Sequence, residues 1–261
     1  MLAIERRNEI LERLQKEKKV VVSELSQFYQ VTEETIRRDL EKLENDGLAI
    51  KSYGGAVLNE QNIIGLPFDV RKNQCVAEKQ KIAALTAGMV NDGESVMLDV
   101  SSTAVYVVKE LKKKEKLTVI TNSVDIIVEL YDMPGWTVIS TGGTLVATGG
   151  TAGARSFALG GPHTDEMLAS YHVDKAIVSC KGLDLENGIT DYVEQDASSK
   201  RMMLKAARER ILVADYTKFD TTAFTKVADW SAFTKIVTDR RPDGKWLSEF
   251  ERQRIECIYE S

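Results

Sequence analysis

Three short polar segments in the second half of the chain carry residues that could bind a phosphate group. Each follows an apolar stretch typical of a buried strand, and the first, DVSST at 99–103, leads into a helical pattern. Hydroxyls and backbone N–H groups at the N-terminus of a helix form an anion site. The ligands predicted in these segments are Asp99, Ser101, Ser102, Thr103, Thr121, Asn122, Gly142 and Gly143.

Basic residues near the ends of other apolar stretches could complete the site. Lys181 follows the run KAIVSC and Lys218 follows ILVAD, so either ammonium group could pair with a phosphate. Arg155, in a glycine-rich stretch, is an additional candidate. Each residue also has an ordinary explanation, because Ser and Thr cap helices, glycine pairs form turns and single lysines are usually solvated. Their shared position at predicted strand ends favours the binding site.

A second set of residues has the chemistry needed to bind DNA. The stretch 32–47 has its apolar residues at helical spacing, which leaves Arg37 and Arg38 outside the buried stripe. The planar guanidinium group pairs bidentately with guanine or with phosphate. The predicted DNA-binding residues are Ser23, Thr32, Glu34, Thr35, Arg37, Arg38, Lys51 and Tyr53.

The same helix can be explained without DNA. Arg37 stands four residues from both Glu33 and Glu41, and such pairs are common on a solvated helix face. Helix-turn-helix domains also serve as protein–protein modules. The periodicity alone leaves these alternatives open.

The elements around this helix predict a winged helix-turn-helix domain at residues 1–57. The predicted order is a helix at 2–17, a short β-branched segment at 20–22, a helix with Ser23 as its N-cap, a helix from Thr32 to Gly47, and a hairpin around Gly54 and Gly55. Residues 58–70 show no clear periodicity and are interpreted as a linker.

Residues 71–261 alternate apolar strands with helical patterns, which predicts an α/β domain with a mostly parallel sheet covered on both faces. Helices are predicted at about 79–90, 101–111, 123–131, 198–210 and 247–254. Strands are predicted at 95–100, 117–121, 136–141, 175–180, 211–215, 234–239 and 255–260. Because parallel strands end at the same edge of a sheet, the predicted phosphate ligands should lie together.

The composition narrows the class of protein. With 43% hydrophobic and 29% charged residues and no apolar run of about 18–20 residues, we expect a cytoplasmic protein without a membrane segment. The three cysteines and two histidines lack the spacing of a disulfide framework or a metal site, so neither metal nor cofactor is expected. The net charge of −5 means that attraction to DNA depends on where charges are placed.

The N-terminal segment resembles a known family. The core VTEETIRRDLEKLENDGL followed by YGGA is similar to the DNA-binding domain of the DeoR-type transcriptional regulators. The resemblance implies a winged helix-turn-helix that binds operator DNA as a dimer or higher oligomer, with Thr32, Thr35, Arg37 and Arg38 as DNA contacts. Thr32 stands where the family often has serine, and either residue can cap a helix.

The second half resembles the sensor domain of the same family, which is similar in fold to ribose-5-phosphate isomerases and coenzyme A transferases. The matching pieces are SST at 101–103, TNS at 121–123, TGG at 141–143, KGLDLENGIT at 181–190 and ADYTK at 214–218. The resemblance implies that this domain binds a phosphorylated sugar or a related metabolite. The family more often has glycine where this chain has Ser101, which leaves the backbone geometry of that loop open.

These expectations combine into a ligand-gated regulator, in which a metabolite changes how the protein holds operator DNA. Two alternatives remain. One is a phosphosugar isomerase, although the acidic DGAD-like motif of the isomerases is not found and Asp99, Asp184 and Glu194 show no pairing pattern. The other is a protein-interaction module without a ligand.

Overall fold

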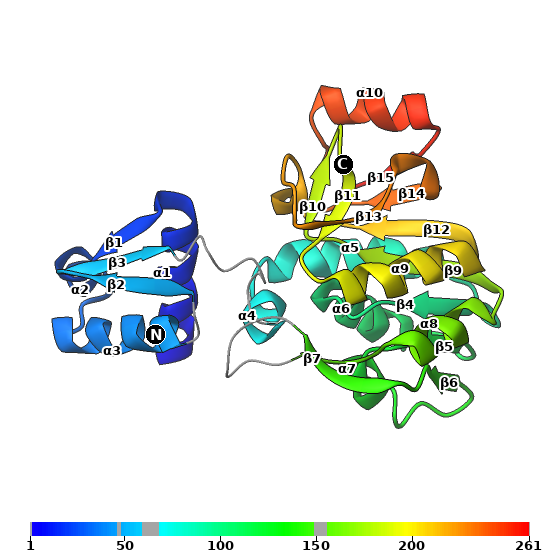
Figure 1. The fold of residues 1–261 in the computed structure, drawn as a ribbon, viewed down its shortest axis with the longest axis horizontal. Coiled ribbons are helices and arrows are strands. Elements are labelled where there is room, and N and C mark those ends of the chain that lie inside the picture. Colours follow the sequence, from blue (N-terminus) through cyan, green and yellow to red (C-terminus); the bar gives the residue numbers. More distant parts are fainter. Residues whose placement is uncertain (1, 46–47, 59–67, 149–155, 261) are drawn as a thin grey trace. The chain divides into compact units, whose positions relative to one another are not determined.

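The computed structural model describes residues 2–45, 48–58, 68–148 and 156–260. These residues form two compact units, the first within the chain up to residue 74 and the second made of 75–148 and 156–260. The division falls four residues after the end of the predicted linker. Figure 1 shows the elements of each unit, which are described separately below.

The first unit is a winged helix-turn-helix, as predicted. Its elements are α1 (Ala3–Glu17), β1 (Lys19–Val21), α2 (Val22–Tyr29), α3 (Glu33–Asn45), β2 (Ala49–Ser52), β3 (Gly55–Leu58) and α4 (Phe68–Asn73). The three strands form an antiparallel sheet in the order β1-β3-β2. Residues 59–67 of the predicted linker lie outside the described residues, and residues 68–70 belong to α4 and are helical.

A small apolar core fixes the orientation of α3. Ile36, Leu40 and Leu43 form the predicted buried stripe, and they pack with Ile10 and Leu14 of α1. Because one face of α3 is committed to this core, the opposite face is presented outward.

A buried ion pair adds to this orientation. Arg6 Nε donates to Asp39 Oδ2 at 2.6 Å, which joins α1 to α3 beside the apolar core. Removing one partner of such a pair leaves a buried charge without compensation and is strongly destabilising. The pair therefore fixes the two helices relative to each other.

The hairpin of the wing depends on two glycines. Ser52 and Gly55 pair across the turn, so Tyr53 and Gly54 form a two-residue loop, and Gly54 adopts φ +81°. A Cβ on Gly55 would lie 2.1 Å from the carbonyl oxygen of Val20, so only glycine lets β1 approach β3. The YGGA motif thus has a structural reason at both glycines.

The second unit is built on a seven-stranded sheet in which every neighbouring pair is parallel. The strand order is β15-β14-β12-β9-β4-β5-β6. These strands are β4 (Ser95–Leu98), β5 (Thr118–Thr121), β6 (Thr137–Ser140), β9 (Val173–Ser179), β12 (Ala207–Val213), β14 (Lys235–Val237) and β15 (Glu256–Ile258). The predicted parallel sheet is confirmed.

Helices cover both faces of this sheet (Figure 1). One group packs together as α5 (Val76–Gly88), α6 (Ser102–Leu111) and α7 (Val124–Glu129), and a second group as α8 (Pro162–Ala169) and α9 (Glu194–Ala206). The last helix, α10 (Gly244–Gln253), buries Trp246 and Phe250 against Trp230. The chain winds outward from β4 in one direction and from β9 in the other, so β4 and β9 flank the point where the direction reverses.

Several elements differ from the prediction. The predicted helix at 198–210 is wrong at both ends, because α9 spans 194–206 and residues 207–210 begin β12. The sequence patterns also did not predict α8, the hairpin β7 (Thr144–Thr148) with β8 (Ser156–Gly160), or the antiparallel sheet of β10 (Gly182–Asp184), β11 (Gly188–Asp191) and β13 (Thr225–Ala228). These strands are short and lie outside the main sheet.

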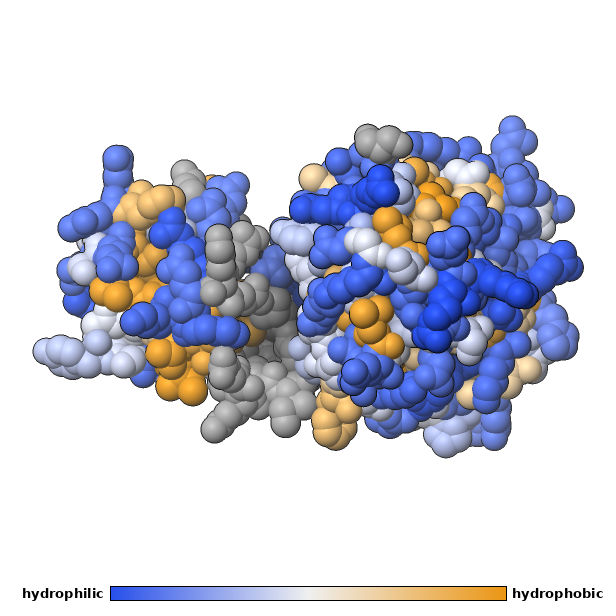
Figure 2. Space-filling model, turned by 90° about the horizontal axis from the view of Figure 1, so that it is seen from above, coloured by the Kyte–Doolittle hydropathy of each residue, from blue (hydrophilic) through white to orange (hydrophobic). Residues whose placement is uncertain are grey.

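Among the described residues, no helix is both long and apolar enough to cross a bilayer. On the face drawn in Figure 2, hydrophobic areas are small and separated by hydrophilic surface.

Candidate functional site

The outward face of α3 carries Arg37 and Arg38 in its second turn, and both are exposed as predicted. The Arg37 side chain is 56% exposed and the Arg38 side chain 77% exposed. Each pairs with a carboxylate one turn earlier: Arg37 Nη2 lies 2.6 Å from Glu33 Oε2, and Arg38 Nε lies 3.4 Å from Glu34 Oε1. The intrahelical pairing that offered an alternative explanation is therefore present, and both guanidinium groups remain accessible.

Two threonine hydroxyls lie at the N-terminus of α3. The Thr32 hydroxyl accepts a hydrogen bond from the backbone N–H of Thr35 at 3.2 Å, so Thr32 is the N-cap of this helix, as predicted. The hydroxyls of Thr32 and Thr35 lie 2.9 Å apart. Hydroxyls at this end of an exposed helix are placed to donate to a phosphate.

Other predicted DNA contacts lie on the wing and on α2. Tyr53 occupies the hairpin loop and is fully exposed. Lys51 is held by Glu44, which accepts from its backbone N–H at 2.9 Å and lies 3.4 Å from its Nζ. Ser23 is exposed but does not cap a helix, because α2 already begins at Val22; that part of the prediction is wrong.

In the second unit, the predicted phosphate ligands gather at the carboxyl edge of the parallel sheet. The edge between β4 and β9 is the point where the winding reverses, and α/β proteins bind ligands at such a point. Asp99 follows β4 and is buried, and its Oδ2 accepts from the backbone N–H of Ser179 in β9 at 2.9 Å. Its Oδ1 accepts from the Ser101 N–H at 3.2 Å, so Asp99 shapes this edge.

A buried lysine that the sequence did not indicate lies beside Asp99. Lys200 of α9 is 4% exposed, and its Nζ binds Asp191 Oδ2 and lies 3.4 Å from Asp99 Oδ2. Burial alone would lower the pKa of Lys200, but the carboxylates around it raise that pKa above its ordinary value. Burial would raise the pKa of Asp191, and the charges of Lys200 and Lys181 bring it below its usual range. Lys200 and Asp191 therefore both favour their charged forms.

The N-terminus of α6 lies at the same edge. Ser101 is its N-cap, and its hydroxyl accepts from the Ala104 N–H at 3.0 Å. Ser101 has extended backbone angles, φ −85° and ψ 151°, so the loop needs no glycine there. The hydroxyls of Ser102 and Thr103 make no hydrogen bond to a described residue in the structure. The capping explanation holds for Ser101, while the next two residues keep their donors at the helix start.

Asn122 carries a buried acceptor at the end of β5. Its Nδ2 donates to the Leu159 carbonyl at 3.1 Å, which fixes the orientation of the amide. Its Oδ1 is buried and has no partner among the described residues, an arrangement that costs free energy unless a donor is supplied. Thr121 differs, because its hydroxyl donates to the Leu98 carbonyl at 2.7 Å and accepts from the Ser123 N–H at 3.1 Å.

The two predicted lysines lie at the ends of neighbouring strands. Lys218 Nζ lies 3.7 Å from Asp215 Oδ2 and donates to the Thr217 hydroxyl at 3.0 Å. Burial would raise the pKa of Asp215, but Lys218 and Thr217 hold it below its usual range. Lys181 is half-buried at the end of β9, and its charge acts on Asp191. Both lysines are therefore within the electrostatic environment of the carboxyl edge.

The two glycines after β6 are explained by the backbone conformation of the turn that they form. Gly142 and Gly143 have φ of +61° and +110°, which favour glycine. A Cβ on Gly143 would lie 2.8 Å from the Gly160 carbonyl oxygen, so the turn packs closely against β8. Thr164 donates to the Gly142 carbonyl at 2.8 Å. Arg155 lies outside the described residues.

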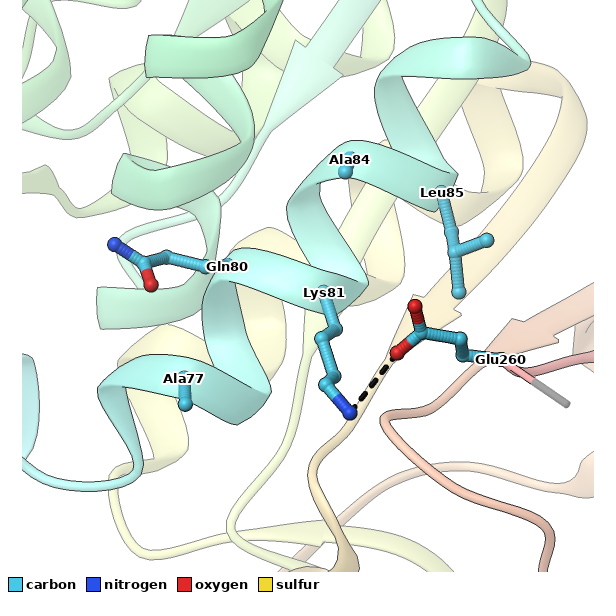
Figure 3. Close-up of a pocket in the computed structure, with 6 residues that line it drawn as sticks. All are labelled: Ala77, Gln80, Lys81, Ala84, Leu85 and Glu260. Atoms are coloured by element: carbon cyan, nitrogen blue, oxygen red, sulfur yellow. Dashed lines mark ion pairs between the residues drawn. The ribbon is translucent and has the colours of Figure 1, made fainter.

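A separate surface pocket does not coincide with these residues. It has a volume of about 410 Å³ and is lined by Ala77, Gln80, Lys81, Ala84, Leu85 and Glu260 (Figure 3). Its polar contact is the Lys81–Glu260 ion pair of 2.9 Å on the outside of α5. No predicted phosphate ligand lines it, and we do not assign it to the effector. In the described ranges, no three His, Cys, Asp or Glu side chains are grouped as metal ligands would be.

The first unit is a helix-turn-helix with accessible arginines. The second is an α/β unit whose sheet carries polar residues at the carboxyl ends of its strands, where the winding reverses. Together they define a DNA-binding regulator with a sensor domain. The chain belongs to the DeoR family. Residues 6–62 match the DeoR-like helix-turn-helix domain, and residues 74–240 match the DeoR C-terminal sensor domain. The resemblance seen in the sequence is thereby confirmed, and the protein is a transcriptional regulator.

Related proteins agree along nearly the whole chain. It is 38% identical to an uncharacterized HTH-type transcriptional regulator, YulB, of Bacillus subtilis, over 98% of this chain and 96% of that protein. It is 33% identical to the transcriptional repressor GlcR of Bacillus subtilis, over 95% and 93%. It is 34% identical to the L-fucose operon activator of Haemophilus influenzae, over 90% and 92%.

A structural likeness accompanies these matches. Ribose 5-phosphate isomerase A of Methanocaldococcus jannaschii shares 15% identity with this chain at a TM-score of 0.38, covering 54% of this chain and 53% of that one. A likeness this small carries no inference about function.

Proposed function

We propose that the protein represses an operon of sugar metabolism and that a phosphorylated sugar binds its sensor unit and changes its affinity for the operator. The family establishes a transcriptional regulator. One relative is named a transcriptional repressor, which supports repression, and another is named an activator of the L-fucose operon, which supports a carbohydrate operon as the target. The two sites are coupled reciprocally in such a switch, typically by about 1–3 kcal/mol.

The DNA contacts proposed are the outward residues of α3 and the wing. Arg37 and Arg38 would contact base edges or phosphates, and Thr32 and Thr35 would contact phosphate at the start of the helix. Lys51 and Tyr53 would reach the flanking backbone from the wing, with Ser23 and Glu34 at the margin of the surface. The exposure of both arginines supports this assignment.

The buried Asn122 amide oxygen carries the proposal for the effector. A ligand hydroxyl at the carboxyl ends of β4 and β5 would satisfy this acceptor, while the phosphate would bind the start of α6 at Ser102 and Thr103. Lys181 and Lys218 would provide positive charge, and Asp99 and Ser101 would hold the loop in place. Thr121, Gly142, Gly143 and Arg155 complete the proposed set.

We also propose that the sensor binds its ligand without converting it. Isomerisation needs a base free to remove a proton next to a carbonyl group. The carboxylates at this edge are engaged: Asp99 with two backbone N–H groups, Asp191 with Lys200, and Asp215 with Thr217 and Lys218. A fixed, charge-paired set of this kind favours binding over proton transfer.

The assembly and location follow from the proposed role. A homo-oligomer, a dimer or a tetramer, would let two copies of α3 bind two half-sites one helical turn apart. Operator DNA lies in the cytoplasm of a bacterial cell, and the protein would act there.

One experiment tests the two halves of the proposal together. Fragments bound by the full-length protein would be selected from genomic DNA and measured by fluorescence anisotropy, with and without a panel of sugar phosphates. We expect specific binding that Arg37→Ala/Arg38→Ala abolishes and that one sugar phosphate shifts by about 5-fold to 150-fold. Asn122→Leu should keep operator binding and lose the response.

The controls separate the two halves. Inorganic phosphate and the free sugar show whether both parts of the ligand are needed. Operator binding that no sugar phosphate shifts would leave the DNA assignment intact and reject the effector. If no fragment binds above the level of random DNA, the operator proposal fails.

A further inference from the structure

The exposed apolar side chains of the second unit gather on α7 and on the β7–β8 hairpin. Helix α7 packs against β8, so the helix and the hairpin lie side by side (Figure 1). Among the described residues of this unit six large hydrophobic side chains are exposed, and four of them lie here: Val128 (62% exposed), Tyr131 (85%), Leu145 (58%) and Phe157 (37%). Single exposed apolar residues are ordinary, but a cluster of them marks an interaction surface.

The register of the hairpin puts two of these side chains on one face. Leu145 pairs with Leu159 across the hairpin, and Phe157 lies two residues before Leu159 on β8. Side chains directly opposite each other, and side chains two residues apart on a strand, point to the same face. Ala158 points to the other face and is only 2% exposed. The hairpin therefore packs through one face and presents Leu145 and Phe157 on the other.

Helix α7 is apolar on two sides. Ile126 and Leu130 are buried within the unit. Val124, Ile127 and Val128 recur at i, i+3 and i+4 and form a second apolar side, half-buried at the first two residues and exposed at the third. A surface helix of a globular protein ordinarily has one apolar stripe and a polar opposite face. The second apolar side of α7 therefore suits a packing partner.

Strand β7 is the outer strand of the hairpin and has an unprotected edge. In the described part of the chain it pairs with β8 and with no other strand. Its sequence, TLVAT at 144–148, contains neither a charged residue nor a proline, which are the usual means of keeping an edge strand from pairing with another chain. The edge strand β15 of the main sheet differs, because it carries Glu256, which pairs with Lys235 at 3.3 Å. The edge of β7 can therefore accept another strand.

The charge of this region decides the kind of partner. Residues 117–148 contain no Lys, Arg or His, and their acidic residues are Asp125, Glu129 and Asp132. Glu129 pairs with Lys112 at 2.5 Å, so little charge is left to attract a basic partner, and there is no cation to attract nucleic acid. An apolar face with a free strand edge is instead complementary to itself. A two-fold axis places the same patch opposite, and two copies of one strand pair antiparallel about such an axis.

The exposed apolar area is of the size that the centre of an interface needs. The four exposed side chains together offer on the order of 400 Å². A stable dimer buries about 800 Å² on each partner, and the centre of its interface is apolar while the rim is polar. The face on α7 and the hairpin therefore supplies the apolar centre of such an interface.

We propose that two copies of the protein associate through the face formed by α7 and the β7–β8 hairpin, with the two β7 strands next to each other across a two-fold axis. The proposal deepens the proposed function and rests on it in one respect, that the protein acts as a homo-oligomer. The face lies beside the proposed effector site, because the Leu159 N–H of β8 donates to the Asn122 carbonyl at 2.8 Å and Asn122 Nδ2 donates to the Leu159 carbonyl.

The test measures self-association of the full-length protein without DNA. Analytical ultracentrifugation over a wide range of protein concentrations gives the size of the assembly and its dissociation constant. Val128→Asp/Leu145→Asp places a charge on the helix and on the hairpin of the proposed face. Phe224→Asp is the matched control, because Phe224 is 72% exposed in the same unit but lies outside α7 and the hairpin.

We expect the wild type to self-associate and the double variant to have a dissociation constant raised by at least about 100-fold, because both changes bury a charge at the centre of the interface. The assembly should fall to the monomer, or to half its size if the wild type is a tetramer. Phe224→Asp should assemble like the wild type. Circular dichroism verifies that each variant is folded. Amide hydrogen exchange of the wild type is a second measurement that needs no substitution: the amides of β7 should be protected in the assembly and exchange faster on dilution.

Three results would overturn the proposal. The wild type could be a monomer at every concentration, or the folded double variant could associate as tightly as the wild type, which would place the interface elsewhere. The amides of β7 could also exchange at the same rate at every concentration, which would mean that no second copy covers them. Failure of the proposed function looks different, because association is measured without DNA. A protein that self-associates through this face but binds no operator would keep this proposal and reject the operator.

Discussion

The two units hold their charged side chains in opposite ways. In the DNA-binding unit, Arg37 and Arg38 are exposed and pair with carboxylates of their own helix. In the sensor unit, Lys200 is buried between Asp191 and Asp99, which come from β11 and from the end of β4. The first arrangement is local and solvated, and the second joins distant segments away from water.

The difference shows what each arrangement permits. An exposed pair contributes about 0.3–0.5 kcal/mol, so a side chain can change partners at little cost. A buried charge loses its solvation and depends on its partners, so it stays where the fold places it. Exposed cations that can change partners are appropriate for a surface that binds DNA. Cations fixed by burial are appropriate for a ligand site whose geometry must be preorganised.

The largest effect expected from this comparison is the loss of Lys200. Lys200→Met leaves Asp191 and Asp99 buried without their cation and should lower the free energy of unfolding by about 3–5 kcal/mol. All three tryptophans, Trp136, Trp230 and Trp246, lie in the second unit, so tryptophan fluorescence during urea unfolding reports on this unit alone.

The control for this variant is on the same helix. Lys205 of α9 is exposed, and Lys205→Met should change stability by less than about 0.5 kcal/mol. Adding Asp191→Asn to Lys200→Met should restore part of the loss. Equal stability of the two lysine variants would show that the buried cluster does not differ from a surface pair.

Acid should also lower the free energy of unfolding of the sensor unit, but by less than Lys200→Met does. If one of the two carboxylates beside Lys200 is protonated, the other still pairs with it. Asp191 and Asp215 have folded pKa values below their usual range, so they bind protons more readily when unfolded. The stability they contribute is present above the unfolded pKa of about 3.9 and is lost as the pH falls through the folded pKa.

Melting followed by tryptophan fluorescence from pH 7 to pH 3 checks this sign. We expect the melting temperature of the sensor unit to fall below about pH 5. In Asp191→Asn the fall should be shallower, because one of the carboxylates with a lowered folded pKa is gone. A melting temperature that rises on acidification would contradict the assignment.

The same contrast separates what the sequence could predict from what it could not. The buried stripe of Ile36, Leu40 and Leu43 and the hairpin at Gly54 follow from local patterns, and both are confirmed. The exposed arginines of α3 are local too, since their positions follow from that stripe. The parallel sheet was predictable because most of its strands contain a short apolar run and alternate with helical patterns.

Lys200 could not be predicted, because a lysine in a helix is ordinarily solvated. Its burial depends on β4 and β9 lying side by side, and Asp99 and Ser179 are 80 residues apart in the chain. The short strands β10, β11 and β13 were not predicted for a related reason. They pair with one another outside the main sheet and carry little apolar pattern.

Helix caps offer a finer comparison of the two units. Ser101 caps α6 in a buried position and Thr32 caps α3 in an exposed one. Ser101→Ala should cost about 1–2 kcal/mol, whereas Thr32→Ala should cost about 0.5–1 kcal/mol because water can replace the lost acceptor. Ser101→Gly should cost only a few tenths, roughly 0.3 kcal/mol. Urea unfolding of the three variants checks this order, and a larger loss for Thr32→Ala would reverse it.

The smallest effect is expected at the Arg38–Glu34 pair, whose atoms lie 3.4 Å apart on an exposed face. A double-mutant cycle of Arg38→Ala and Glu34→Ala should give a coupling energy of at most about 0.5 kcal/mol in stability. The Lys200–Asp191 cycle should give several times more, because neither of those charges can reach water when its partner is removed. A coupling at Arg38 as large as that at Lys200 would mean that this arginine is fixed in place, and α3 would then lack the mobile cation that operator binding is proposed to use.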